Sequence, residues 1–140
     1  MRHRVKSKKL NRSSGHRKAL FKNLAKDLFL HGQITTTETK AKVVQPIIEK
    51  LITRAKKQNL QARRMIQDFF SDGTITTHVV DRIAPQLDSR TSGYTRIRKI
   101  GPRRGDDTMM ASLSLVDRIV PVEAATENTK KVKKTKAKKD

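Results

Sequence analysis

The chain has 140 residues, of which 33 are Lys or Arg and 13 are Asp or Glu, so its formal net charge at pH 7 is +20. This length accommodates one domain, and the absence of cysteine excludes disulfide scaffolds and thiolate zinc sites. No apolar run approaches the ~20 residues that cross a bilayer, and no apolar signal segment follows the basic start, so we expect a cytoplasmic protein.

The positive charge is concentrated at the two ends of the chain. Residues 1–26 contain ten Lys or Arg, and the first acidic residue is Asp27. Residues 123–140 contain seven Lys and little that could be buried, which is typical of a disordered tail. We therefore predict one domain over residues 1–122, whose residues 1–13 form a basic arm, and a disordered Lys-rich tail over residues 123–140.

A helix followed by a short strand is predicted at the start of the folded part. Leucines recur every four residues from Leu20, which places one apolar face on a helix. Ser13 or Ser14 can cap its start, and Gly32 can end it. The β-branched run at residues 33–37 predicts a brief strand.

A second helix is predicted from an apolar stripe over residues 41–55. Thr35, three residues before Glu38, offers a capping box, although either of the next two threonines could cap the helix as well. Pro46 lies inside the stripe and removes one backbone hydrogen bond. We expect a kink there rather than a break, because the apolar spacing continues beyond it.

Two more helices are predicted between residues 59 and 87. Asn59 can cap the first of them. Asp72-Gly73 predicts a turn, and Thr76 or Thr77 can cap a short fourth helix that carries Pro85 near its end.

The last third of the sequence changes to the two-residue period of strands. Residues 94–100 and 109–116 alternate in this way and are joined by a glycine-rich loop, which predicts an antiparallel hairpin. Arg96 and Arg98 fall on one face of its first strand, and Arg103 and Arg104 lie at its tip.

No group of residues in the sequence predicts catalysis, a metal site or a cofactor. The four histidines have neither the spacing of a helical zinc pair nor a cysteine partner. Asp106 and Asp107 are adjacent, so their carboxylates tend to diverge, and residues 101–105 lack the spacing and the Lys-Ser/Thr ending of a phosphate-binding loop. We expect no catalytic residue, no cofactor and no small-molecule substrate.

The N-terminal basic segment, residues 2–18, predicts binding to nucleic acid. Arginine can hold a phosphate with two hydrogen bonds, and lysine acts as a mobile point charge. The alternatives are a solvated terminus without a role and a membrane-surface helix, which is disfavoured because the apolar stripe is needed for the core. The candidate contact residues of this segment are Arg2, His3, Arg4, Lys6, Lys8, Lys9, Arg12, Ser13, Ser14, His16, Arg17 and Lys18.

The composition favours folded RNA as the nucleic acid. One Tyr and no Trp argue against a base-stacking platform, and no recognition-helix pattern is present. Dispersed positive charge suits recognition of RNA shape and backbone. Arg96, Arg98, Arg103 and Arg104 would add one basic edge on the hairpin, unless they form only a solvated strand face.

Five separated motifs also carry a family resemblance. They are Met1-Arg2-His3-Arg4 with residues 8–17, residues 34–42 with Pro46 and 49–53, Ile83-Ala84-Pro85, residues 93–97, and residues 103–106. In this order, over residues 1 to about 118, they resemble the bacterial large-subunit ribosomal protein seventeen family.

The resemblance implies an α+β fold in the order α-β-α-α-α-β-β, with a small three-stranded mixed sheet covered on one face by about four helices. This order agrees with the elements predicted above. The resemblance also implies a structural constituent of the large ribosomal subunit that binds 23S rRNA near the polypeptide exit tunnel, beside neighbouring ribosomal proteins. The implied RNA contacts fall on residues 2–18 and on Arg96, Arg98, Arg103 and Arg104.

Two other classes of function remain as alternatives. The lysine-rich tail would suit a nucleoid-type protein that compacts DNA. An RNA-processing enzyme would need a titratable or metal-binding cluster that the sequence does not show.

Overall fold

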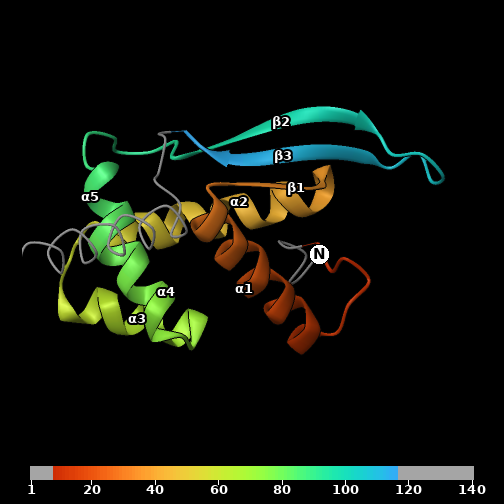
Figure 1. Ribbon diagram of the computed structural model, residues 1–140. Helices are drawn as coiled ribbons and strands as arrows, with labels where there is room; N and C mark the ends of the chain where they lie inside the picture. The colour runs from red at the N-terminus through yellow and green to blue at the C-terminus, as the bar shows by residue number, and fades with distance from the viewer. Residues whose placement is uncertain (1–7, 117–140) are drawn as a thin grey trace, which may run out of the picture.

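The protein is described from a computed structural model, which covers residues 8–116 (Figure 1). The elements in chain order are α1 (Ser14–His31), β1 (Gln33–Thr37), α2 (Glu38–Ala55), α3 (Leu60–Phe70), α4 (Gly73–Thr77), the π-helical segment η1 (His78–Ile83), α5 (Ala84–Gln86), β2 (Thr95–Pro102) and β3 (Met109–Leu115). Because α4, η1 and α5 follow one another without a gap, they form one helical segment. The predicted α+β order is confirmed, and the predicted tail lies outside the described residues.

The three strands form a sheet in the order β1-β3-β2, and both pairings are antiparallel. The expectation of a mixed sheet is therefore wrong in this respect. β1 and β2 run in the same direction, but β3 lies between them and runs against both, so the two parallel strands never share hydrogen bonds. Figure 1 shows the helices on one side of the sheet, where α2 packs against all three strands and α1 against β1 and β3.

Three of the predicted helix ends are confirmed. Ser13 caps α1 by accepting a hydrogen bond from the His16 N–H, and Gly32 ends it with φ 73°, a conformation that glycine adopts without a Cβ clash. Asn59 caps α3, where its Oδ1 accepts the Ala62 N–H at 2.7 Å.

The predicted capping box at Thr35 and the predicted start of the fourth helix are wrong. The N-cap of α2 is Thr37, one of the two alternative threonines, although its side chain makes no capping bond. Glu38 does not close a capping box, because its carboxylate pairs with Lys42 at 2.7 Å and with Lys99 at 3.4 Å. The fourth helical segment begins at Gly73 rather than after Thr76 or Thr77, because Asp72 both turns the chain and caps α4 by accepting the Thr74 N–H.

The core lies between the sheet and the helices. The stripe of α2 is buried from Ala41 to Ala55, and the helix continues through Pro46. Its neighbours in the core include Phe29 of α1, Ile66 of α3 and Leu113 of β3. This core joins the sheet to α2, and within residues 8–116 the helices cover only this face of the sheet (Figure 1).

The segment that leads into β2 is anchored to α2 by polar contacts. Glu49 accepts hydrogen bonds from the backbone N–H groups of Tyr94 and Thr95. The Lys56 ammonium donates to the carbonyls of Asp88 and Arg90 and lies 5.6 Å from the centre of the Tyr94 ring. These contacts fix where β2 starts and therefore which way its side chains point.

Candidate nucleic-acid interface

The open face of the sheet carries two polar rows that end in arginine. The strand register places Gln33, Ser114 and Arg96 in one row. It places Thr35, Ser112 and Arg98 in the next, about 6.6 Å further along the strands. Both arginines are exposed, whereas the alternate positions, such as Leu113, face the core. This face is basic along the β2 edge and polar along β1, where Gln33 and Thr35 are exposed, whereas Ser112 between Thr35 and Arg98 is buried.

The sequence indicated the arginines of these rows but not their neighbours. The alternation of Ser112 and Ser114 placed both serines on one face of a strand, yet their partners on β1 depend on a pairing between distant parts of the chain. The amide and hydroxyl groups add neutral donors and acceptors beside the guanidinium groups, which is the mixture that contacts sugar and phosphate oxygens.

An ion pair shapes the tip of the β2–β3 hairpin. The Arg103 guanidinium donates to both carboxylate oxygens of Asp106, with Nη2–Oδ2 2.6 Å and Nε–Oδ1 3.1 Å. Thr108 donates its hydroxyl to the same carboxylate. These hydrogen bonds, that from Arg103 first, lower the pKa of Asp106 far below its usual range. The carboxylate is charged at neutral pH and holds Arg103 in the loop.

Both arginines of this tip are exposed, but they differ in their ion pairs. Among residues 8–116, no ion pair is made by Arg104, whereas its neighbour Arg103 is paired. The loop folds through Gly105 and Asp107, both with positive φ, and through a hydrogen bond from the Arg103 N–H to the Thr108 carbonyl. The folded loop therefore presents one free guanidinium.

The described part of the N-terminal basic segment begins with a turn and continues into α1. Lys8 and Lys9 are exposed, and the chain turns at Leu10 and Asn11, both with positive φ. Arg12 folds back over this turn, donating from Nη1 to the Leu10 carbonyl at 3.0 Å. Its Nε is buried and has no partner among the described residues.

Further cations of this segment lie on the first turns of α1. His16 and Lys18 are exposed and Arg17 is half-buried, whereas the first turn contains no acidic residue. Cations near a helix N-terminus add to the positive end of the helix dipole. This end of α1 is therefore electrostatically unfavourable alone, and an anion placed there would stabilise it.

The structure therefore divides the predicted site residues into three groups. Arg96 and Arg98 share the open sheet face, Arg103 and Arg104 lie at the hairpin tip, and residues 8–18 form a third group at the start of α1. In Figure 1 the first residues of the described chain and the hairpin tip both lie at the right of the molecule. Arg2, His3, Arg4 and Lys6 lie outside the described residues.

The remaining titratable groups do not form a chemical site. His78 is buried, and its Nε2 donates to the Phe29 carbonyl at 3.1 Å. Burial lowers its pKa, and the nearby charge of Arg82 lowers it further, so the ring is neutral and structural. Within residues 8–116, no three acidic, histidine or cysteine side chains gather as metal ligands, and no helix is both long and apolar enough to cross a membrane.

Comparison with known proteins gives matches over most of the chain. The family model described as Ribosomal protein L17 matches residues 20–116. A Large ribosomal subunit protein bL17 of Petrotoga mobilis is 47% identical over 124 residues, covering 83% of this chain and 97% of the relative. A protein of the same name from Rubrobacter xylanophilus is 43% identical over 117 residues, covering 84% and 97%.

Proposed function

We propose that the chain, which belongs to the ribosomal protein L17 family and is a structural constituent of the large ribosomal subunit, binds 23S rRNA through its N-terminal basic segment and its β2–β3 hairpin. The family is not an enzyme family. The resemblance of this chain to the family also supports a place on the outer face of the subunit near the polypeptide exit tunnel, beside neighbouring ribosomal proteins.

The observation that carries this proposal is the placement of cations without carboxylate partners. Arg96, Arg98 and Arg104 stand exposed on one hairpin, and Lys8, Lys9 and Lys18 are exposed at the start of the described chain. Within residues 8–116 no ion pair neutralises any of these six. A backbone of regularly spaced phosphates supplies the missing negative charge.

The sheet face, the N-terminal basic segment and the hairpin tip would contact the RNA in different ways. The rigid sheet face suits the backbone of a folded RNA helix, which is recognised by its shape and its 2′-hydroxyl groups. The N-terminal basic segment adds separate phosphate contacts, and Arg104 adds one at the hairpin tip, where Arg103 is paired with Asp106. Nothing in these surfaces supplies the aromatic stacking that unpaired bases would require.

The test is a titration of 23S rRNA with the full chain at several salt concentrations. The comparison chain lacks residues 1–12 and so retains the Ser13 cap of α1. We expect weaker binding and a shallower salt dependence, by about 0.7–0.9 units in log–log slope for each phosphate that the shortened chain no longer binds. An unchanged slope would remove the segment from the interface.

Duplex DNA as a competitor tests the DNA-compacting alternative in the same assay. A ribosomal protein that recognises RNA shape should prefer 23S rRNA at equal ionic strength. Equal competition by DNA would contradict specific RNA recognition.

A further inference from the structure

A second group of cations lies at the end of α2, away from the proposed interface. Lys50, Arg54 and Lys57 are exposed. They follow one another at four and three residues, so they share one side of the helix end. We call these three residues the α2 basic cluster.

The α2 basic cluster has no carboxylate partner within residues 8–116, in contrast to four other cations on or beside the helices. Carboxylates pair with Lys26, Lys42, Lys56 and Arg63. Over residues 8–116 no ion pair includes a member of the cluster. Like charges four residues apart on a helix repel one another, so an external anion would stabilise the cluster.

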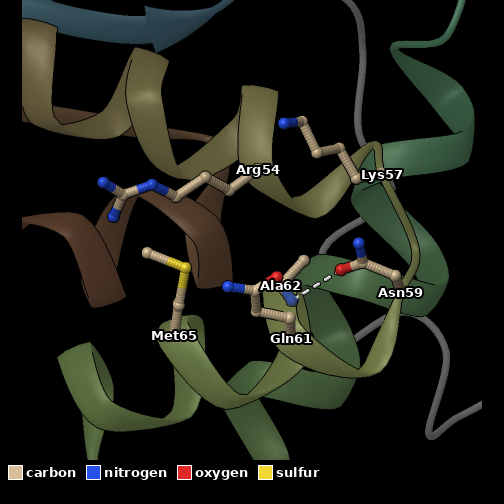
Figure 2. Close-up of a pocket in the computed structure, with 6 residues that line it drawn as sticks. All are labelled: Arg54, Lys57, Asn59, Gln61, Ala62 and Met65. Atoms are coloured by element: carbon tan, nitrogen blue, oxygen red, sulfur yellow. Dashed lines mark hydrogen bonds between the residues drawn. The ribbon is translucent and has the colours of Figure 1, made fainter.

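A hollow of about 190 Å³ adjoins the cluster where the end of α2 faces the first turns of α3. Figure 2 shows Arg54 and Lys57 on α2 and its exit, with Met65 of α3 on the opposite side. Its lining is completed by Asn59, Gln61 and Ala62.

The polar groups of this hollow suit an anion. The Asn59 Oδ1 is occupied by the Ala62 N–H, which leaves its amide NH₂ as a donor. Gln61 is exposed and offers a second amide. No carboxylate lines this hollow, whereas Asp68 lines the hollow of about 340 Å³ between α1 and α3. In a third hollow, of about 220 Å³ between α3 and α4, Arg63 is already paired with Asp81. The α2–α3 hollow has two cations in its lining, Arg54 and Lys57, that make no ion pair within residues 8–116, and it is therefore better suited to phosphate.

We propose that the α2–α3 hollow and the α2 basic cluster hold a phosphate of a second rRNA segment, distinct from the one at the hairpin. This inference rests on the proposed function, since it takes the polyanion to be rRNA. Arg54 supplies the bidentate fork, Lys50 and Lys57 supply point charges, and the Met65 side chain offers an apolar surface to a ribose.

The hollow and the hairpin tip lie on opposite sides of the molecule (Figure 1). In Figure 1 the junction of α2 and α3 lies at the left of the molecule, and the hairpin tip lies at the right. The protein body would then join two RNA segments, with α2, about 27 Å long, as the rigid spacer between them.

The test uses the full chain with 23S rRNA and the double substitution Arg54→Gln/Lys57→Gln. The matched control, Arg64→Gln/Arg82→Gln, removes the same charge from exposed positions on α3 and η1. Backbone protection of the RNA against hydroxyl radicals is mapped for each chain, and binding is measured across salt concentrations. We expect the first variant to lose protection of one RNA segment and about one to two units of salt slope, while the protection given by the hairpin persists.

The other outcomes separate this inference from the proposed function. A protection map like that of the control variant would overturn the inference alone. If the same variant is assembled into large subunits, loss of a cross-link to a neighbouring ribosomal protein with RNA protection intact would overturn it in favour of a protein partner. Failure of the unaltered chain to protect 23S rRNA would overturn both.

Discussion

The Glu49 carboxylate on α2 accepts the backbone N–H of Thr95, the first residue of β2, at 2.9 Å. Its other oxygen accepts the N–H of Tyr94, and the Thr95 hydroxyl also donates to the carboxylate. One side chain thus satisfies three donors and joins the middle of a helix to the start of an edge strand. Arg96 follows immediately, so the direction of this arginine depends on the same interaction.

We expect Glu49→Ala to lower the free energy of unfolding by about 2–4 kcal/mol, because the donors of Tyr94 and Thr95 are left without a charged acceptor. Glu49→Gln retains one acceptor oxygen and should cost less than the alanine substitution. Denaturant unfolding of the two variants measures the difference. Equal stability of Glu49→Ala and the unaltered chain would show that the carboxylate does not hold the strand.

The two arginines of the hairpin tip should differ in their effect on RNA binding. Arg104→Gln should weaken binding and reduce the salt slope by about one unit, because it removes an unpaired cation. Arg103→Gln/Asp106→Asn removes a pair of opposite charges and should leave the slope unchanged. A reduced slope in the double variant would show that Arg103 itself binds phosphate.

A carboxylate introduced on β1 should disturb the arginine two strands away. Thr35 lies in the same row as Arg98, about 9.5 Å distant across the small Ser112 side chain. Thr35→Glu should therefore pair with Arg98, repel phosphate and weaken rRNA binding several-fold, with a shallower salt slope. Thr74→Glu, an exposed substitution on α4, is the control and should bind normally. Normal binding by Thr35→Glu would contradict RNA binding on this sheet face.

The buried His78 predicts a pH dependence of stability. Its pKa in the folded protein lies below the ordinary value of 6.5, chiefly because burial disfavours the imidazolium. Between the folded and unfolded pKa values the unfolded chain binds more protons, so the free energy of unfolding rises with pH up to about 6.5 and then levels off. His78→Gln keeps a donor for the Phe29 carbonyl and should flatten this rise. Denaturant midpoints at several pH values measure it, and an identical rise in the variant would assign it to another group.

The helix ends could be predicted where one residue type decides them locally. Ser13, Asn59 and Gly32 each satisfy or release backbone groups within their own turn, so their effect is visible in the sequence. Asp72 was assigned to a turn because Asp-Gly favours turns, yet the same carboxylate caps α4 and binds Lys26 of α1 at 2.9 Å. That ion pair depends on tertiary packing, which a local pattern does not contain.

The candidate site likewise has features that the local sequence indicates and features that depend on tertiary packing. The cations of residues 2–18 were identifiable because no carboxylate precedes Asp27 in the sequence. The row that joins Thr35 to Arg98 could not be predicted from the sequence. It forms only when β3 pairs between β1 and β2, which come from opposite halves of the chain. The pairing of Arg103 with Asp106 has a local signal, which is the three-residue spacing of opposite charges. A count of charged residues does not reveal this spacing.

The order β1-β3-β2 also constrains how the protein is made. The central strand is the last element of the described chain, so β1 has no hydrogen-bonding neighbour until translation has passed Leu115. Helices can form early on a nascent polypeptide, but the sheet closes only by long-range pairing once β3 has been synthesised. A product truncated before Met109 therefore exposes the apolar underside of its helices, and only a finished molecule can offer a complete basic surface for assembly.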